Sequence, residues 1–183
     1  ADDRHVVNEA YAGDIIGVFD PGIFSIGDTV CAPGKKFRFE GIPTFAPEHF
    51  ARVTLIDSMK RKQFVKGIRQ IAQEGAIQVF QEIHGGMEEI IVGVVGVLQF
   101  DVLKFRIENE YNVDIRLEML PYEYIRWIEN WHDVDLDHIV GTSDMKKVED
   151  MKGQPLLLFV NSWSVGMVLD RNEGLVLTEF SRN

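Results

Sequence analysis

The order of elements predicted between residues 50 and 119 constrains the fold more than any other feature of the sequence. Two segments, 58–73 and 97–111, carry apolar residues at the spacing of an amphipathic helix. Shorter segments with strand patterns surround them, at 50–56, 77–83, 89–95 and 113–119. The predicted order is strand, helix, strand, strand, helix, strand, which is the ferredoxin-like arrangement.

The first predicted helix has a single apolar face, formed by Phe64, Ile68, Ile71 and Ala72. Ser58 is its predicted N-cap, and Gly75 is predicted to end it. The opposite face carries three closely spaced cations with a fourth beside them: Lys62, Lys66, Arg69 and Arg61. These four residues are the candidate site, either as an ordinary solvated helix face or as an electrostatic footprint for an anionic partner.

The second predicted helix is apolar on two roughly opposite faces. One face holds Phe100, Leu103 and Ile107, and the other holds Leu98, Val102 and Phe105. Because one sheet cannot cover both faces, we expect this helix to lie between its own sheet and a second layer supplied by the rest of the chain. Phe100 is the best single candidate for the core.

Residues 5–40 read as short β-like runs separated by turns, at 5–9, 14–19, 27–32 and 36–40. This pattern predicts hairpins of a β-barrel, and because the region holds too few strands to close one, an exposed open edge. Cys31 is expected to be buried in a strand, and as the single cysteine it has no internal disulfide partner.

After residue 119 we predict further elements: strands at 124–129, 156–160 and 175–180, and helices at 144–152 and 162–172. The predicted fold class is α+β, with a partial β-barrel followed by a ferredoxin-like α/β sandwich that has a C-terminal α/β extension. The corresponding domains are 1–44 and 45–183.

Composition limits the partners and the compartment. The 45% hydrophobic content is that of a packed globule, and no uncharged run of about 20 apolar residues or signal-peptide core is present, so we expect a cytoplasmic protein. The net charge of -10 argues against broad adhesion to RNA, because affinity for phosphate comes from Lys and Arg. This net charge is still compatible with a small local cluster of basic residues that binds RNA.

The chain also lacks a phosphate-binding loop, which requires Gly-x-x-x-x-Gly-Lys-Ser/Thr. The nearest fragment, Gly34-Lys35-Lys36, has no upstream glycine at the right offset and is followed by Phe37. We therefore expect this polypeptide by itself not to hydrolyse GTP.

Four phrases, in the same order, resemble the release factor 3 family of bacterial translational GTPases: residues 39–48 (FEGIPTFAPE), 74–80 (EGAIQVF), 94–102 (VVGVLQFDV) and 111–113 (YNV). The resemblance implies the end of the second domain, similar to the barrel of the elongation factors, and all of the third domain. It further implies docking on the ribosome, with small-subunit RNA and protein as direct partners and the class I release factor as an indirect one. In that reading the candidates for the contact with ribosomal RNA or protein are Arg61, Lys62, Lys66 and Arg69. GTP, GDP and Mg would bind in the missing parent domain, and no cofactor is expected in this fragment.

In that family the intact GTPase ejects class I release factors during translation termination, so the resemblance implies a non-catalytic region that transmits a GTP-dependent rearrangement. Two alternatives stay open. One is the corresponding region of another translational GTPase such as elongation factor G, and the other is a small-molecule enzyme on a ferredoxin-like scaffold. A monomer is expected, with edge-strand association of the truncated barrel as the alternative.

Three further patterns favour structural readings. Asp133, Asp135, Asp137 and Asp144 match offsets 1, 3, 5 and 12 of a calcium loop, but His138 stands where the loop needs glycine, so a solvated acidic loop is favoured and no metal site is predicted. His84 lacks a nucleophile at a motif spacing, so no catalytic residue is predicted. The tryptophans form either an aromatic surface or core, and core is favoured for Trp127 and Trp163.

Overall fold

The computed structural model describes residues 5–40 and 45–181. The chain divides into two compact units, residues 1–41 and 42–183. The second unit contains one antiparallel sheet with three α-helices, and the first contains turns joined by irregular backbone. Each unit is described by itself.

The second unit is built on an eight-stranded sheet in the order β4-β1-β3-β2-β6-β7-β5-β8, with every neighbouring pair antiparallel. The strands are β1 (His49–Leu55), β2 (Gln78–Glu82), β3 (Glu89–Val94), β4 (Ile115–Leu120), β5 (Tyr124–Ile128), β6 (Lys146–Asp150), β7 (Pro155–Phe159) and β8 (Leu177–Thr178). The helices are α1 (Arg61–Gln73), α2 (Leu98–Glu110) and α3 (Ser162–Arg171). The order β1, α1, β2, β3, α2, β4 is the predicted order for residues 50–119.

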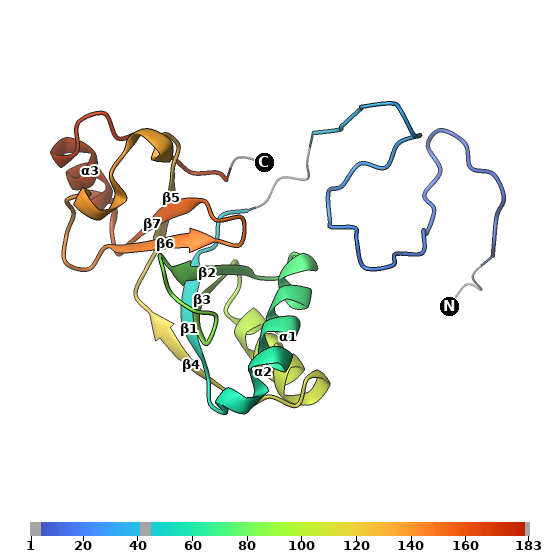
Figure 1. The fold of residues 1–183 in the computed structure, drawn as a ribbon, viewed down its shortest axis with the longest axis horizontal. Helices are drawn as coiled ribbons and strands as arrows, with labels where there is room; N and C mark the ends of the chain where they lie inside the picture. The colour runs from blue at the N-terminus through green and yellow to red at the C-terminus, as the bar shows by residue number, and fades with distance from the viewer. Residues whose placement is uncertain (1–4, 41–44, 182–183) are drawn as a thin grey trace. The chain divides into compact units, whose positions relative to one another are not determined.

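Helices α1 and α2 cover one face of strands β1 to β4 (Figure 1). The predicted inner face of α1 is buried, as Phe64, Ile68 and Ile71 all belong to this core cluster. Gly67 lets the two helices approach closely, because a Cβ there would lie 2.8 Å from Ile107 Cδ1 and 2.9 Å from the Tyr111 ring. Helix α1 therefore packs both on the sheet and on α2.

Ser58, the predicted N-cap of the first helix, is not its cap, because a short 3₁₀ turn precedes α1. Asp57 caps a short 3₁₀ turn, Ser58–Lys60, and its carboxylate accepts a hydrogen bond from the Met59 backbone N–H at 3.0 Å. Helix α1 then continues from Arg61 with no side-chain cap of its own. Gly75, with φ of 80°, follows the C-cap Glu74, as predicted.

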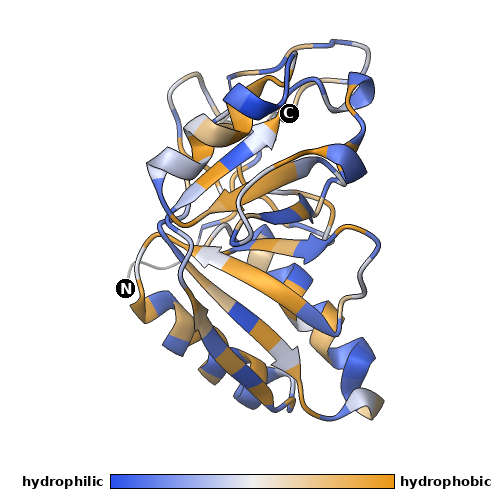
Figure 2. Cartoon of the chain, turned by 90° about the vertical axis from the view of Figure 1, so that its left-hand side faces the viewer, coloured by the Kyte–Doolittle hydropathy of each residue, from blue (hydrophilic) through white to orange (hydrophobic). Residues whose placement is uncertain are grey.

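The opposite face of the sheet forms a second core. Strand register places its members on one side of the sheet: Phe50, Phe80, Ile91, Ile125, Trp127, Val148, Leu156 and Leu158. No helix contributes to this cluster of buried side chains, so the sheet bends and its two halves cover one another. Figure 2 shows the largely hydrophobic strands at the centre of the unit. Trp127 is in the core, as predicted.

This arrangement corrects the prediction for the second helix. Phe100, Leu103 and Ile107 are buried, but the opposite face is open, with Leu98, Val102 and Phe105 exposed by 74%, 55% and 66%. The extra layer covers the free face of the sheet and not the free face of the helix. A sheet face carrying Phe50, Phe80 and Ile91 offers a broader apolar surface than one helical stripe.

A third core lies on the other side of β5 and β7, under α3. It joins Ile128, Leu157 and Phe159 to Val168 of the helix. Asn161 caps α3, and its Oδ1 accepts a hydrogen bond from the Ser164 N–H at 2.9 Å. Trp163, predicted to be core, is exposed because the helix turns it away from Ser164 and Val168, which are buried.

Two C-terminal predictions also change. Residues 144–152, predicted as a helix, contain strand β6, because backbone pairing with β2 on one side and β7 on the other holds this segment extended. Met145, Val148 and Met151 have helical spacing in sequence, yet Val148 is the one fully buried in the sheet core. The closing strand predicted at 175–180 is reduced to the two residues of β8.

The first unit differs from its predicted form. No strand is present among residues 5–40, so the β-like runs predicted there are wrong, while turns occur at Gly13, Gly22, Gly27 and Gly34, each with positive φ. A strand needs a hydrogen-bonded neighbour and a covered apolar face, and here Ile15 and Phe19 are exposed. Cys31 is exposed as well, contrary to prediction, and its thiol donates to the Lys35 carbonyl at 2.8 Å.

Candidate functional site

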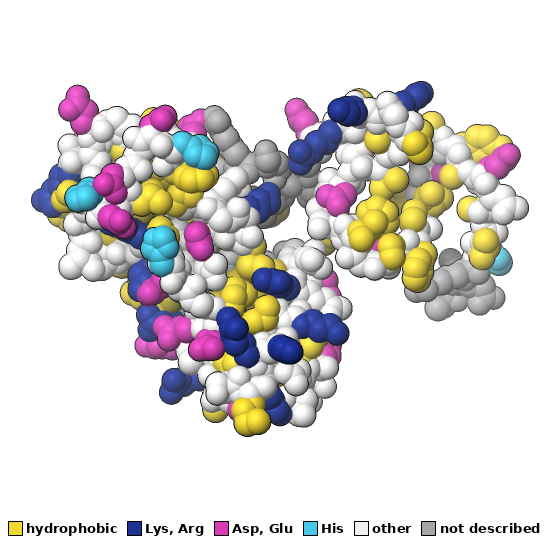
Figure 3. All heavy atoms as spheres, viewed as in Figure 1, with side chains coloured by type: hydrophobic (Ala, Val, Ile, Leu, Met, Phe, Trp, Pro, Cys, Tyr) yellow, Lys and Arg dark blue, Asp and Glu magenta, His cyan; other side chains and the backbone are white. Residues whose placement is uncertain are grey.

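The outer face of α1 presents the four predicted cations to solvent. Lys62, Lys66 and Arg69 recur at i, i+4 and i+7, directly opposite the buried face, and Arg61 lies beside them; all four are exposed. Figure 3 shows Lys and Arg side chains gathered over this helix. Helix α1 contains no Asp or Glu, although the chain as a whole has a net charge of -10. We call Arg61, Lys62, Lys66 and Arg69 the basic face.

Most cations of the basic face are not neutralised by a nearby carboxylate. Arg61 Nε lies 3.4 Å from Glu88 Oε1, in an ion pair between two exposed side chains. Within residues 5–40 and 45–181, Lys62, Lys66 and Arg69 form no ion pair. Three unneutralised cations on one short stripe attract phosphate or carboxylate groups, and the attraction weakens as salt rises.

Contacts with α2 hold the basic face in place. The Arg106 guanidinium donates to both carboxylates around it, to Glu74 at the end of α1 and to Glu110 one turn along α2. The hydrogen bond from Arg106 lowers the pKa of Glu74, and the same bonds raise the pKa of Arg106. The Tyr111 hydroxyl bonds the Gln70 side chain, and burial raises the pKa of Tyr111. Helix α1 is therefore fixed at its C-terminal half.

The start of α1 is fixed by a separate contact. Lys60 Nζ donates to the Asn112 carbonyl at 2.7 Å, which ties the turn before α1 to the loop after α2. Both ends of α1 are thus held against the C-terminal part of α2 and the loop that follows it, and the cations of α1 project from a packed layer.

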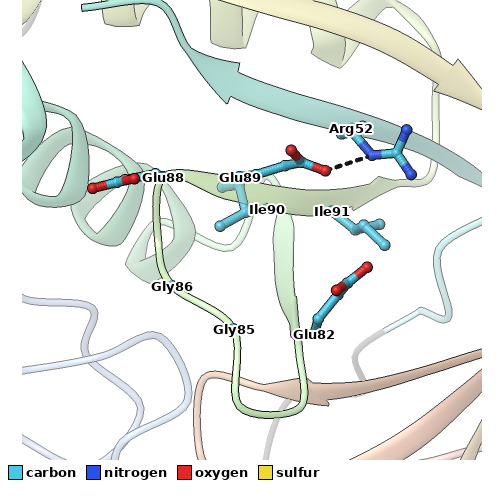
Figure 4. Close-up of a pocket in the computed structure, with 8 residues that line it drawn as sticks. All are labelled: Arg52, Glu82, Gly85, Gly86, Glu88, Glu89, Ile90 and Ile91. Atoms are coloured by element: carbon cyan, nitrogen blue, oxygen red, sulfur yellow. Dashed lines mark ion pairs between the residues drawn. The ribbon is translucent and has the colours of Figure 1, made fainter. Parts of the chain in front are cut away.

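A shallow hollow of about 250 Å³ lies on the β2–β3 side of the unit. Its charged groups are already paired: Arg52 contacts Glu89 at 2.9 Å and Glu118 at 3.0 Å, and Glu82 pairs with Lys146. Figure 4 shows Arg52 and Glu89 directed toward each other across neighbouring strands. The sequence patterns did not indicate this hollow, which strand register completes by placing Arg52 of β1 beside the β2–β3 hairpin.

The acidic segment forms two short turns, Trp131–Asp133 and Leu136–His138. Asp135 accepts hydrogen bonds from the Asp137 N–H at 3.1 Å and from His138 Nδ1 at 2.5 Å, and the His138 contact lowers the pKa of Asp135. No group of three or more potential metal ligands gathers anywhere in the described chain. The Asp135 carboxylate is thus engaged with its own turn.

The remaining candidates are dispersed. His84 lies exposed in the β2–β3 turn with φ of 67°. The Trp127 indole N–H donates to Asp150 at 3.1 Å inside the sheet core, Trp131 stacks on His132, and Trp163 is exposed on α3. These positions belong to different parts of the unit, so they do not make one aromatic surface. Of the helices described, none has the length and apolar character needed to span a membrane.

Comparison with known proteins identifies the family. The model of the family described as "Class II release factor RF3, C-terminal domain" matches residues 39–169. The chain is 51% identical over 176 residues to Peptide chain release factor 3 of Symbiobacterium thermophilum, covering 96% of this chain and 33% of that protein. It is 44% identical over 179 residues to the protein of the same name from Gloeobacter violaceus, covering 98% and 34%.

A third relative with this name, from Listeria monocytogenes, is 44% identical over 178 residues, covering 97% of this chain and 33% of its own length. The chain thus spans about a third of the relatives it matches. These matches confirm the resemblance seen in residues 39–48, 74–80, 94–102 and 111–113, and they favour release factor 3 over elongation factor G. The chain belongs to the peptide chain release factor 3 family of translation termination factors and corresponds to its C-terminal region.

Proposed function

We propose that this chain is a non-catalytic ribosome-docking region, and that it transmits the GTP-dependent rearrangement by which the longer protein ejects class I release factors. Family membership supplies the context, because the relatives are named for peptide chain release. The observation that carries the proposal is the basic face of α1, four exposed cations on a helix without a single acidic residue. Small-subunit RNA and protein are the proposed direct partners, in the cytoplasm.

The packing of the second unit is suited to a rigid lever. Strands β1 to β4 with α1 and α2 make a unit that we assign to the ferredoxin-like class, on the basis of the sheet order β4-β1-β3-β2. The second half of the sheet packs over the first through a continuous apolar core. A body with such a core moves as a unit when one end is displaced.

In this proposal the nucleotide acts elsewhere in the longer protein. The sequence of this chain has no Gly-x-x-x-x-Gly-Lys-Ser/Thr phosphate loop. GTP, GDP and Mg would bind in the part of the relatives that this chain does not match. This region would then contribute binding and mechanical coupling, with no hydrolysis of its own.

Charge reversal on the basic face tests the docking. Binding of the 183-residue chain to 70S ribosomes would be measured by co-sedimentation at several salt concentrations. We expect the Lys62→Glu, Lys66→Glu, Arg69→Glu variant to bind at least about tenfold more weakly, with a flatter dependence on salt, because fewer counterions are released. Unchanged affinity and unchanged slope would reject the basic face as the docking surface.

The matched control reverses three exposed cations that lie on other elements: Lys104, Arg116 and Arg171. The change in net charge is identical, so a general electrostatic effect would weaken both variants equally. A loss confined to the α1 variant supports a local footprint. Equal losses in the two variants would contradict it.

A further inference from the structure

Helix α2 has an outer face that nothing in its own unit covers. Leu98, Val102 and Phe105 follow one another at i, i+4 and i+7, all exposed, on the side opposite the buried Phe100 and Leu103. Two valines before the helix, Val95 and Val97, are about half exposed and extend the apolar surface toward its start. We call Leu98, Val102 and Phe105 the apolar stripe.

A contiguous apolar stripe is unlike the scattered apolar residues that every protein surface carries. An outer helix face that meets only solvent is ordinarily polar, as the outer face of α1 is. Helix α2 has almost no amphipathic bias, because large apolar side chains occupy opposite sides. Its outer side is therefore suited to burial against a second surface.

The charges beside the stripe indicate which kind of surface fits. Asp101 is exposed and forms no ion pair among the residues that the structure describes, while Lys104 lies 3.9 Å from Glu108, and Arg106 is engaged by Glu74 and Glu110. An apolar stripe with an unpaired carboxylate at its border does not suit the phosphate backbone of RNA. It suits a protein surface with apolar side chains and a Lys or Arg at the rim.

The geometry points to an interdomain contact: the apolar stripe of α2 is the docking surface for another domain of the longer release factor. This inference rests on the proposed function, in which the chain is one region of a multidomain GTPase. The relatives are about three times as long as this chain, so two thirds of their length is available to supply the partner surface. Interfaces between domains of one chain commonly join apolar and polar surface in this way.

Such a contact would place the nucleotide-dependent part of the protein directly against the layer that presents the basic face. Helix α2 is bound to α1 through Arg106 and Glu74 and through the close approach at Gly67. A domain seated on α2 would therefore hold α1 in a defined orientation. In this arrangement the outer face of α2 binds another domain of the same protein, and the outer face of α1 binds the ribosome.

Cysteine labelling tests the contact in the absence of ribosomes. Phe105→Cys and Trp163→Cys are made separately in a Cys31→Ser background, since Cys31 is exposed and would react. Phe105 and Trp163 are matched in exposure, at 66% and 67%, but lie on α2 and α3. Each variant is prepared as the 183-residue chain and as a chimaera in which this chain replaces the corresponding third of the Symbiobacterium thermophilum relative, 51% identical to it.

The rate of maleimide addition is followed by mass spectrometry at pH 7. In the chimaera we expect the Phe105→Cys thiol to react at least about tenfold more slowly than in the 183-residue chain, because it reacts only when the domains separate. The Trp163→Cys thiol should react at the same rate in both. Val102→Cys provides a second position on the stripe if the Phe105 variant fails to fold, as judged by circular dichroism.

Four results would overturn the inference. Equal rates for Phe105→Cys in the chain and the chimaera would show that no domain covers α2, and equal slowing of both thiols would show general shielding. Slow reaction already in the 183-residue chain, relative to its urea-unfolded form, would assign the stripe to the chain's own first unit or to a second copy. Slowing in the chimaera only after ribosomes are added would assign it to the ribosome. None of these rates depends on the basic face, so a failure of the docking proposal would remain distinguishable.

Discussion

Helices α1 and α2 have the same length, 13 residues, and lie on the same face of the same sheet, yet they differ on the side turned away from it. Inward they are equivalent, each contributing three large apolar side chains to one core: Phe64, Ile68 and Ile71 from α1, and Phe100, Leu103 and Ile107 from α2. Outward, α1 is cationic and α2 is apolar. The inner faces are constrained by the core, and the outer faces are where the two helices differ.

Burial explains why the inner faces resemble one another. Both helices cover strands whose apolar side chains must be removed from water, so the residues on their inner sides must be apolar as well. The outer sides contribute little to this core and are free to differ. In this helix pair the inner faces therefore report on folding, and the outer faces are the place to test the two proposed contacts.

The largest expected effects would test the equivalence of the inner faces. Phe64→Ala and Phe100→Ala should each reduce the free energy of unfolding by about 3 to 5 kcal/mol, because each leaves a cavity in a packed core. Urea unfolding followed by circular dichroism measures both. A loss below about 1 kcal/mol for either variant would show that its helix is not part of the core.

The contact between the helices gives the next largest effect. Gly67→Ala adds a Cβ within 3 Å of Ile107 and the Tyr111 ring, so we expect a net loss of about 1 to 3 kcal/mol in unfolding free energy. Gly166→Ala on α3 is the matched control, since its Cβ would meet open space. The control should gain about 0.5 to 1 kcal/mol from helix propensity alone. Equal gains at both sites would mean that α1 and α2 are not in close contact.

The ion pair between the helices should give a smaller, pH-dependent effect. The hydrogen bond from Arg106 holds the pKa of Glu74 in the folded protein below its value in the unfolded chain. The ion pair therefore stabilises the fold fully above the unfolded-state pKa of Glu74, and this stabilisation is lost as the pH falls through the folded-state pKa. Both side chains are partly exposed, so Glu74→Gln should cost only a few tenths to about 1 kcal/mol at pH 7. Urea titrations of the two proteins should converge as the pH is lowered through this range. A difference that grows on acidification would have the wrong sign.

The smallest effect is expected on the outer face of α2. Phe105→Ser should change the unfolding free energy of the 183-residue chain by no more than about 0.5 kcal/mol, because the ring is exposed. The same urea titration applies, with Phe100→Ala as the buried comparison on the same helix. A cost of several kcal/mol at Phe105 would mean that the stripe is already covered within this chain.

Local periodicity predicted the first half of the second unit well, because each of its elements carries its own pattern. The order of elements, the inner faces of both helices and the four exposed cations of α1 all followed from residues close in sequence. Periodicity was a poorer guide for residues 144–152, where a helix was predicted and pairing with β2 and β7 produced a strand. Intrinsic preference is weak, and two neighbouring strands override it.

The family, the basic face and the α/β order were therefore readable along the chain, because motifs, charges and apolar spacing are properties of neighbouring residues. Three outcomes depended on contacts between residues far apart: the bending of the sheet around Phe50 and Trp127, the exposure of the α2 stripe, and the absence of strands among residues 5–40. In each case the chain has more apolar surface than the remaining segments can bury. Which one is buried is decided by the free energy of the assembled whole, and no single segment carries that information.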